Sequence, residues 1–396
     1  MNDTQLFTDL NGVYGSAVHA GIKEKGLDLA YIYVPDAVSS AGVFTQHKFA
    51  SSSVLHTKKT MKKHTIKAVV INSGNANTAT GSKGEADTKT LARIAAKQLQ
   101  LNPSEVGVSA TGIIGKHLPM TVVEPALESL LAEPQKKEGN LVAEGILTTD
   151  LVPKSVFVSK KIGKKTITVA GITKGSGMIA PNMATTLGYL VTNCALDTQQ
   201  LQSALNEAAD LSYNMMSVDA DTSTSDMLLC FATGQYKINT HDKDELQAFQ
   251  SLLNEASISL AKQIAKDGEG ASKLIEVSIT GAASKKDASL MAKQVIDSPL
   301  VKTAIHGEDP NWGRLIMAIG KNPDLKLNPK KVSISIGSEL IFSKGEPVAY
   351  NEASVKQVLA GSEVGISIDC ALATGSATAW GCDLTKAYID INTDYN

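Results

Sequence analysis

Short strand-like and longer helix-like stretches follow one another along this chain without a regular strand–helix alternation. Residues 66–72, 166–172 and 332–336 place β-branched side chains at alternating positions, which predicts β-strands. Apolar residues at helical spacing predict helices at 197–211 and 243–266. Further helices are predicted near 85–100, 119–132 and 286–296. This irregular order predicts an α+β fold built in layers rather than a doubly wound parallel sheet.

Two residues mark the ends of predicted helices. Asp197 can accept a hydrogen bond from the first turn of the helix over 197–211, so it is expected to be the N-cap. Gly268 is expected to end the long helix over 243–266, because glycine tolerates the left-handed backbone found there. Four lysines at 160, 161, 164 and 165 are interpreted as the solvated edge of a hairpin.

Composition excludes several classes of function. The 396 residues include 43% apolar and 20% charged side chains, enough to bury the core of a two- or three-lobed protein. A net charge of −2 predicts no nucleic-acid partner and no membrane partner. The N-terminus lacks the pattern of a signal peptide, and no apolar run is long enough for a membrane helix. A cytoplasmic protein is therefore expected.

The cysteines and histidines give no metal-binding pattern. Cys194, Cys230, Cys370 and Cys382 are far apart and form no Cys-x-x-Cys pair, which predicts reduced, buried thiols. The seven histidines show no ligand spacing, so no metal is expected.

The segment 173–193 carries the strongest indication of chemistry. Gly175, Gly177 and Pro181 predict an irregular loop, and residues 185–191 then read as a buried strand. A threonine such as Thr185 at this junction can act as a nucleophile on a rigid element. From the residues alone, a simple turn before a core strand remains the alternative.

A threonine hydroxyl needs a base beside it before it can attack a carbonyl group. If the chain is cut before Thr185, its own nitrogen becomes an amine with a reference pKa of about 7.7–8.0. Such an amine is partly neutral near pH 7 and can accept the hydroxyl proton. Before the cut the nitrogen is an amide, so activity should depend on cleavage.

Lys174 through Leu187 read KGSGMIAPNMATTL and resemble a pattern of the glutamate N-acetyltransferases, also called ornithine acetyltransferases. Thr186 stands where that family usually has methionine. The resemblance extends over nearly the whole chain. Further matching blocks lie at 41–45 (AGVFT), 72–77 (NSGNAN), 218–226 (VDADTSTSD), 309–314 (DPNWGR) and 381–385 (GCDLT).

The resemblance implies a fold and a processing step. The implied fold is a layered α/β sandwich of the DmpA/ornithine acetyltransferase-like type, with two lobes and the active site between them. Self-cleavage between Ala184 and Thr185 would give an α chain, 1–184, with the oxyanion residues and a β chain, 185–396, with the nucleophile. Two copies of each chain are expected to associate.

The implied reaction transfers acetyl from N2-acetylornithine to glutamate through an acetyl-threonine, in arginine biosynthesis. No cofactor is expected, although acetyl-CoA could serve as a second acetyl donor. An alternative is an N-terminal-nucleophile amidohydrolase or aminopeptidase, which resolves the acyl-enzyme with water. A non-enzymatic alternative is a small-molecule-binding protein that never cleaves.

Site residues are carried over from the family position by position. The Thr111 hydroxyl and the Gly112 amide are expected to stabilise the oxyanion. Lys174 is expected to hold a substrate carboxylate. Thr148 is chosen over Thr149 as a substrate contact from its spacing to Lys174.

The remaining contacts lie in the C-terminal half. Glu269 is expected to pair with a substrate ammonium, and Asn392 is expected to touch substrate. The family tail runs on from the asparagine to a final Thr or Ser, which the sequence ending at Asn396 lacks. Either that contact is missing, or Asn396 or the terminal carboxylate replaces it. The acidic residues Asp219, Asp221 and Asp226 are interpreted as turn and hydrogen-bonding residues rather than metal ligands.

Overall fold

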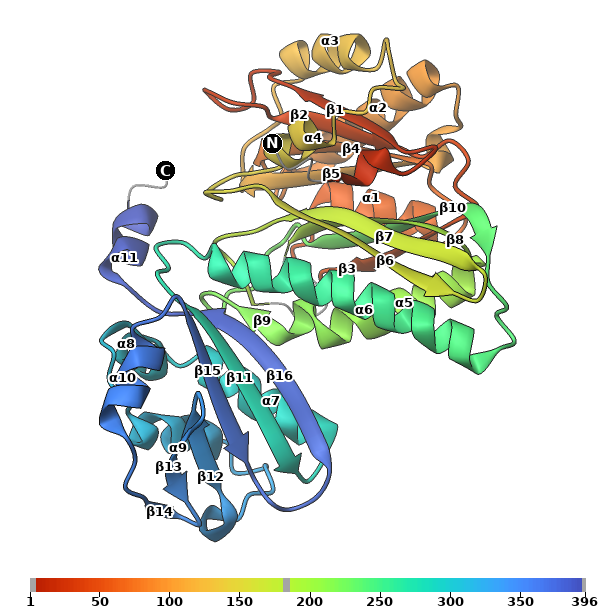
Figure 1. Cartoon of the computed structure of the whole chain (residues 1–396). Helices are drawn as coiled ribbons and strands as arrows, with labels where there is room; N and C mark the ends of the chain where they lie inside the picture. The colour runs from red at the N-terminus through yellow and green to blue at the C-terminus, as the bar shows by residue number, and fades with distance from the viewer. Residues whose placement is uncertain (1–4, 181–185, 394–396) are drawn as a thin grey trace. The chain divides into compact units, whose positions relative to one another are not determined.

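The computed structural model describes residues 5–180 and 186–393 and divides them into two compact units (Figure 1). Unit 1 comprises residues up to 175, 186–213 and 222–260, and unit 2 comprises 176–180, 214–221 and the chain from 261. Each unit has its own sheet structure. Each of the two chains expected from cleavage, 1–184 and 185–396, contributes described residues to both units.

Unit 1 is built on two sheets. The first has the order β1-β2-β4-β5, with β4 and β5 parallel and the other pairs antiparallel. The second has the order β3-β10-β8-β7-β6, in which only β10 and β8 are parallel. The strands of the first sheet are Tyr14–Val18 (β1), Leu29–Tyr33 (β2), Ala68–Asn75 (β4) and Val106–Ile113 (β5). Those of the second are Ser39–Phe44 (β3), Lys154–Ile162 (β6), Lys165–Lys174 (β7), Leu187–Ala195 (β8) and Met227–Lys237 (β10).

The two sheets of unit 1 share one apolar core. Alternate residues of β2 and β4, such as Ile32 and Ile71, are buried in the same cluster as Ile172 of β7, Tyr189 of β8 and Phe231 of β10. Side chains two apart on a strand point to the same face, so this alternation packs the sheets against each other. The other face of the first sheet packs on helices, with Tyr31 and Val108 in one cluster with Leu91 and Leu127.

Helices complete the layers of unit 1. Gly81–Leu99 (α2) and Met120–Leu130 (α3) cover the outer face of the first sheet (Figure 1). Thr198–Leu211 (α5) packs on β3 and β10 of the second sheet. Gly139–Gly145 (α4) packs on β1. The order is therefore helix, sheet, sheet, helix, which confirms the predicted layered α+β class.

Helix α1, Ser52–Met61, covers the free edge of β5. The Thr57 hydroxyl donates to the Val108 carbonyl oxygen at 2.7 Å and accepts from the Val108 amide at 2.8 Å. His56 Nε2 lies 3.3 Å from the carbonyl oxygen of Val106. Side chains of the helix thus satisfy backbone groups that an edge strand would leave unpaired.

Unit 2 contains a seven-stranded mixed sheet with the order β14-β13-β12-β15-β11-β16-β9. Its strands are Met216–Ser217 (β9), Leu274–Ala282 (β11), Ser333–Ile336 (β12), Glu339–Ser343 (β13), Glu346–Pro347 (β14), Glu363–Asp369 (β15) and Gly375–Cys382 (β16). Its helices are Lys285–Ile296 (α7), Pro299–His306 (α8), Trp312–Gly320 (α9), Glu352–Leu359 (α10) and Lys386–Thr393 (α11). Helix α7 packs on β11 and β16. The long helix Lys243–Lys266 (α6) crosses the division between the units.

Most local expectations from the sequence are confirmed. Asp197 caps α5 by accepting from the Gln200 amide at 2.8 Å, and α6 ends two residues before Gly268. The left-handed backbone expected at Gly268 is absent, and the residue instead allows close packing, because a Cβ there would lie 2.8 Å from Cys382 Sγ. The lysines around Gly163 are exposed on the turn between β6 and β7. All four cysteines are buried free thiols, and burial raises the pKa of Cys230 to about 12.

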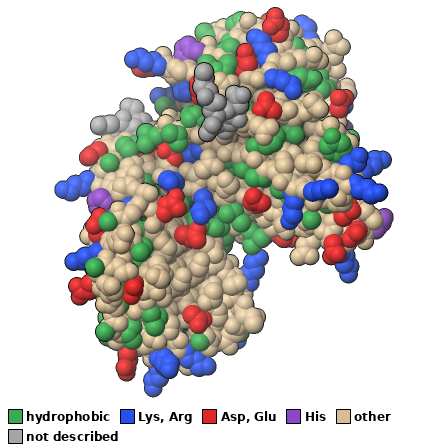
Figure 2. All heavy atoms as spheres, in the orientation of Figure 1, with side chains coloured by type: hydrophobic (Ala, Val, Ile, Leu, Met, Phe, Trp, Pro, Cys, Tyr) green, Lys and Arg blue, Asp and Glu red, His purple; other side chains and the backbone are tan. Residues whose placement is uncertain are grey.

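The surface carries no dominant charge on the face drawn in Figure 2, where acidic and basic side chains are interspersed. This matches the net charge of −2. Within the described residues, no helix is both long enough and apolar enough to cross a bilayer.

Candidate functional site

Thr111 and Gly112 lie at the end of β5, where its register with β4 shifts. Gly112 has a φ of 128°, and a Cβ there would lie 2.3 Å from the carbonyl carbon of Gly74. Only glycine fits this backbone without displacing β4. The Thr111 side chain is buried, and no described residue hydrogen-bonds to its hydroxyl. The strand end therefore places a hydroxyl that is available to a ligand beside a close approach of two backbones that only glycine allows.

Three asparagines brace the strand that faces this pair. The Asn72 side chain donates to the Asn75 carbonyl oxygen at 2.7 Å, and the Asn75 side chain accepts from the Asn77 amide at 2.8 Å. The Asn77 side chain in turn donates to Thr88 in α2. Asparagine tolerates the positive φ of 49° at Asn77. The asparagines of the block 72–77 (NSGNAN) thus fix the turn opposite Thr111 and Gly112.

Lys174 and Thr148, two of the predicted substrate contacts, are brought together by the fold. Lys174 is the last residue of β7, is 8% exposed, and its Nζ donates to the Thr148 hydroxyl at 3.1 Å. Thr149 has no such contact with Lys174. The structure does not test whether either residue binds substrate, so that part stays a prediction.

Asp150 organises this region, a role that the sequence did not reveal. Its carboxylate accepts from Lys154 Nζ at 2.7 Å, the Gly175 amide at 2.6 Å and the Thr148 amide at 3.1 Å. Burial alone would raise the pKa of Asp150, but the charges of Lys174 and Lys154 and these hydrogen bonds hold it below its usual value. A charged Asp150 therefore positions both Thr148 and the chain after Lys174.

The predicted nucleophile Thr185 and its neighbour Ala184 lie outside the described residues. The next residue, Thr186, is buried, and its hydroxyl donates to the Lys174 carbonyl oxygen. Its own carbonyl oxygen accepts from the Met227 amide at 2.8 Å. The chain directly after Thr185 is thus fixed between β7 and β10.

In unit 2 the structure pairs Glu269 with Asn392. Asn392 Nδ2 donates to a Glu269 carboxylate oxygen at 2.8 Å, and Glu269 is only 7% exposed. The loop 176–179 packs against Glu269, whose amide donates to the Ser176 carbonyl oxygen at 3.0 Å. A Cβ at Gly177 would lie 2.3 Å from the Glu269 carboxyl carbon, so glycine leaves the room that the carboxylate occupies. The tail contact predicted near Asn396 lies outside the described residues.

The acidic block 219–226 divides into two environments. The Asp219 carboxylate accepts from the amides of Met178 and Ile179 at 2.7 and 2.8 Å, which is the hydrogen-bonding role expected for it. Asp226, in unit 1, is buried and leaves one carboxyl oxygen without a partner. Burial raises the pKa of Asp226 well above its usual value, although hydrogen bonds from Ser223 and Thr45 and the charge of Lys174 oppose this. In the described part of the chain, no three His, Cys, Asp or Glu side chains are grouped as metal ligands.

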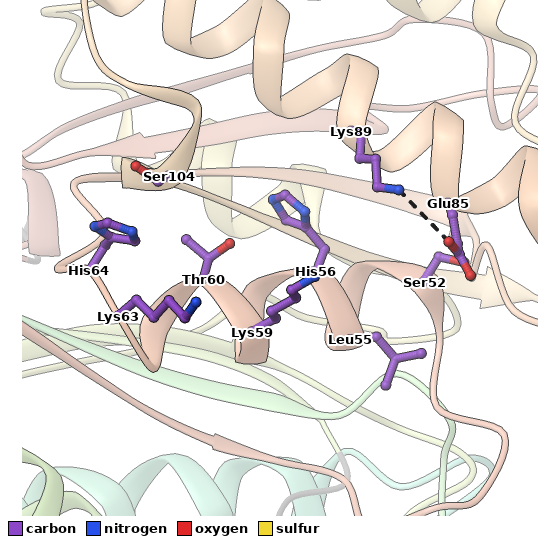
Figure 3. Close-up of a pocket in the computed structure, with 10 residues that line it drawn as sticks. All are labelled: Ser52, Leu55, His56, Lys59, Thr60, Lys63, His64, Glu85, Lys89 and Ser104. Atoms are coloured by element: carbon purple, nitrogen blue, oxygen red, sulfur yellow. Dashed lines mark ion pairs between the residues drawn. The ribbon is translucent and has the colours of Figure 1, made fainter.

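A separate surface cavity of about 440 Å³ lies between α1 and α2 (Figure 3). Lys59, Lys63 and Lys89 line it together with a single acid, Glu85, which pairs with Lys89 at 3.8 Å. Burial, helped by the charges of Lys89 and Lys59, lowers the pKa of His56 in its wall. None of the predicted site residues lies in this basic pocket.

The layers and the buried lysine, threonine and aspartate cluster define a layered α+β protein with a buried polar cluster in unit 1. Comparison with known proteins gives the family. The ArgJ family model matches residues 14–396. The arginine biosynthesis bifunctional protein ArgJ of Oceanobacillus iheyensis is 42% identical over 391 residues, covering 98% of this chain and 95% of the relative. The ArgJ of Bacillus subtilis is 41% identical over 387 residues, covering 97% and 95%. The chain belongs to the ArgJ family.

A crystal structure of the arginine biosynthesis bifunctional protein argJ from Bacillus halodurans matches with 40% identity and a TM-score of 0.50. The match covers 52% of this chain and 97% of the solved chain. The solved chain is thus about half as long as this one.

Proposed function

We propose that this protein is a glutamate N-acetyltransferase of arginine biosynthesis, which moves acetyl from N2-acetyl-L-ornithine to L-glutamate. The observation that carries the proposal is the match to ArgJ proteins over almost the entire chain. The buried contact between Lys174 and Thr148 supports it, because both family positions meet in the fold.

We further propose that the chain activates itself by cleavage before Thr185. The Thr185 hydroxyl attacks the Ala184 carbonyl carbon, and the peptide nitrogen leaves as the amine of Thr185. Water then hydrolyses the Ala184 ester, which frees the hydroxyl again. The products are chains 1–184 and 185–396, and the new amine is the base that the hydroxyl needs.

Two observations support this cleavage. The matching solved chain from Bacillus halodurans is about half as long as this chain, as a cleaved product would be. The sheet also allows it, because residues 169–174 of β7 pair with residues 187–192 of β8 across the cleavage point. β10 pairs with β3 in the same sheet, so the two pieces would stay joined by backbone hydrogen bonds after the cut. Two copies of each piece form the proposed assembly.

Acetyl transfer then proceeds in two steps. The amine of Thr185 takes the hydroxyl proton as the oxygen attacks the acetyl carbon of acetylornithine. The Thr111 hydroxyl and the Gly112 amide donate to the oxyanion, and losing one such donor typically costs about 10²–10³ in rate. Ornithine leaves with the proton on its nitrogen, and the amine of glutamate then attacks the acetyl-threonine ester.

The binding residues follow from the common part of both substrates. Each substrate has an α-carboxylate, which Lys174 and Thr148 are proposed to hold in both steps. Glu269, oriented by Asn392, is proposed to pair with a substrate ammonium. No cofactor takes part in this reaction, and acetyl-CoA is a proposed second donor. The proposed place of action is the cytoplasm.

Intact-mass spectrometry tests the proposal. The purified protein should give the masses of 1–184 and 185–396, and acetylornithine should add one acetyl group to the second chain only. Thr185→Ala should stay full-length and lack transfer, whereas Thr149→Ala should cleave and transfer normally. A cleaved Thr185→Ala protein would disprove self-cleavage by this residue.

The acceptor distinguishes a transferase from a hydrolase. Glutamate should remove the acetyl group from the second chain and appear as N-acetylglutamate. Release of acetate at a rate that glutamate does not change would favour the amidohydrolase alternative.

A further inference from the structure

Lys23 lies in a loop that one buried carboxylate holds in place. The fully buried Asp28 side chain accepts from the backbone amides of Ala20, Ile22 and Lys23 at 2.6, 2.7 and 2.9 Å. A carboxylate with three amide donors fixes the loop backbone. The start of the Lys23 side chain is therefore set by the fold rather than by solvent.

The Lys23 side chain extends from this loop past the end of β5, where Thr111 and Gly112 lie. Its Cγ lies 2.5 Å from the place where a Cβ of Gly74 would stand, and Gly74 is paired with Gly112. Its Nζ donates to the Leu147 carbonyl oxygen at 3.1 Å, one residue before Thr148. The ammonium thus sits between the Thr111–Gly112 end of β5 and the threonine that Lys174 contacts.

Positive charge exceeds negative charge in this part of unit 1. Three lysines, Lys23, Lys154 and Lys174, lie near two carboxylates. Asp28 already accepts from three loop amides, and Asp150 accepts from Lys154 and two amides. Burial lowers the pKa of Lys23, the charges of Asp28 and Asp150 oppose that change, and the charge of Lys174 adds to it. Two half-buried or buried ammonium groups near each other repel, and an anion between them would relieve that repulsion.

We propose that Lys23 is a second cationic contact for the α-carboxylate of the substrates, facing Lys174 across Thr148. This inference rests on the proposed function, because it names a further residue for the same substrates. Lys23 gives up no proton and makes no covalent bond in this role. It selects acetyl donors and acceptors that carry a carboxylate next to the reacting nitrogen.

Inhibition by ornithine and by putrescine tests the proposal, because putrescine is ornithine without its carboxylate. In Lys23→Met, whose side chain still covers Gly74, ornithine should inhibit about 10- to 100-fold less well, the loss expected for one charge-assisted hydrogen bond. The inhibition constant of putrescine should not change. KM for acetylornithine and glutamate should rise by a similar factor while kcat changes less.

Two matched variants separate charge from structure. Lys23→Arg keeps the charge and should recover most of the ornithine affinity, whereas Lys25→Met, an exposed lysine in the same loop, should behave like the unaltered protein. Equal weakening of ornithine and putrescine would overturn the proposal, since it would indicate a purely structural role. Unchanged ornithine inhibition in Lys23→Met would overturn it as well.

Failure of the proposed acetyltransferase function can be distinguished from failure of the role proposed for Lys23. In that case the unaltered protein would form no N-acetylglutamate from acetylornithine and glutamate. Active unaltered protein with a carboxylate preference independent of Lys23 contradicts only the role of Lys23.

Discussion

Two regions of unit 1 each gather three lysines near an acidic ion-pair partner, yet the two ion pairs differ in length and in exposure to water. At the buried cluster, Asp150 and Lys154 lie 2.7 Å apart with side chains 0% and 1% exposed. In the basic pocket, Glu85 and Lys89 lie 3.8 Å apart with side chains 61% and 64% exposed. The first pair is removed from water and fixed by backbone amides, whereas water screens the second. The same residue types therefore define a rigid centre in one place and a solvated surface in the other.

The largest effect is expected at the buried carboxylate. Asp150→Ala removes the carboxylate partner of a fully buried lysine, which should lower the free energy of unfolding by about 3–5 kcal/mol. Urea denaturation at pH 7 measures this loss. The pKa of Asp150 is lowered in the fold, so its contribution is present above about pH 3.9 and disappears as the pH falls through the lowered value.

The basic pocket supplies the matched control. Glu85→Gln breaks an exposed pair of the same kind and should change the free energy of unfolding by less than about 0.5 kcal/mol. If Asp150→Ala and Glu85→Gln lowered the free energy of unfolding by the same amount, burial would not explain a difference between the two regions.

A second buried carboxylate, Asp226, should respond to pH in the opposite direction. Its raised pKa means that the folded protein keeps a proton that the unfolded chain loses above about pH 3.9. Stability should therefore fall by about 1.4 kcal/mol for each pH unit above 3.9, up to the raised pKa. Asp226→Asn mimics the protonated form and removes this slope. Urea denaturation from pH 4 to 7 measures this. The free energy of unfolding of the variant should rise relative to that of the unaltered protein as the pH increases, and parallel curves of the two proteins would contradict the prediction.

The sequence alone predicted what depends on local patterns. The cap of Asp197 on Gln200 and the strands predicted at 166–172 and 185–191, which the structure has as Lys165–Lys174 and Leu187–Ala195, follow from side chains that are close in the chain. The proximity of Lys174 to Thr148 was expected only through the family resemblance, because 26 positions separate them.

Other parts of the site depend on long-range packing. Gly177 was predicted only as part of an irregular loop, but it provides the space for Glu269, which lies far along the chain. Lys23 hydrogen-bonds to the carbonyl oxygen of Leu147, which is 124 positions away, and no spacing in the sequence indicates that contact. Asp150 was visible in the sequence only as a polar residue after two threonines. Its role emerges from three donors that tertiary structure brings together.

The last effect on stability is expected in the basic pocket, at His56, where it is confined to a narrow pH range. Burial, with the charges of Lys89 and Lys59, lowers the pKa of His56 below the value of about 6.5 that it has in an unfolded chain. The unfolded chain therefore takes up a proton first as the pH falls below 6.5, and the fold loses stability from that point down to the lowered pKa. His56→Gln keeps a donor for the Val106 carbonyl oxygen. The variant should flatten the curve of the free energy of unfolding against pH between pH 5.5 and 7. The slope that one proton can contribute there is at most about 1.4 kcal/mol per pH unit. Urea denaturation across this range measures it, with the exposed His64→Gln as control. An unchanged slope in His56→Gln would mean that water screens this histidine as fully as it screens the lysines around it.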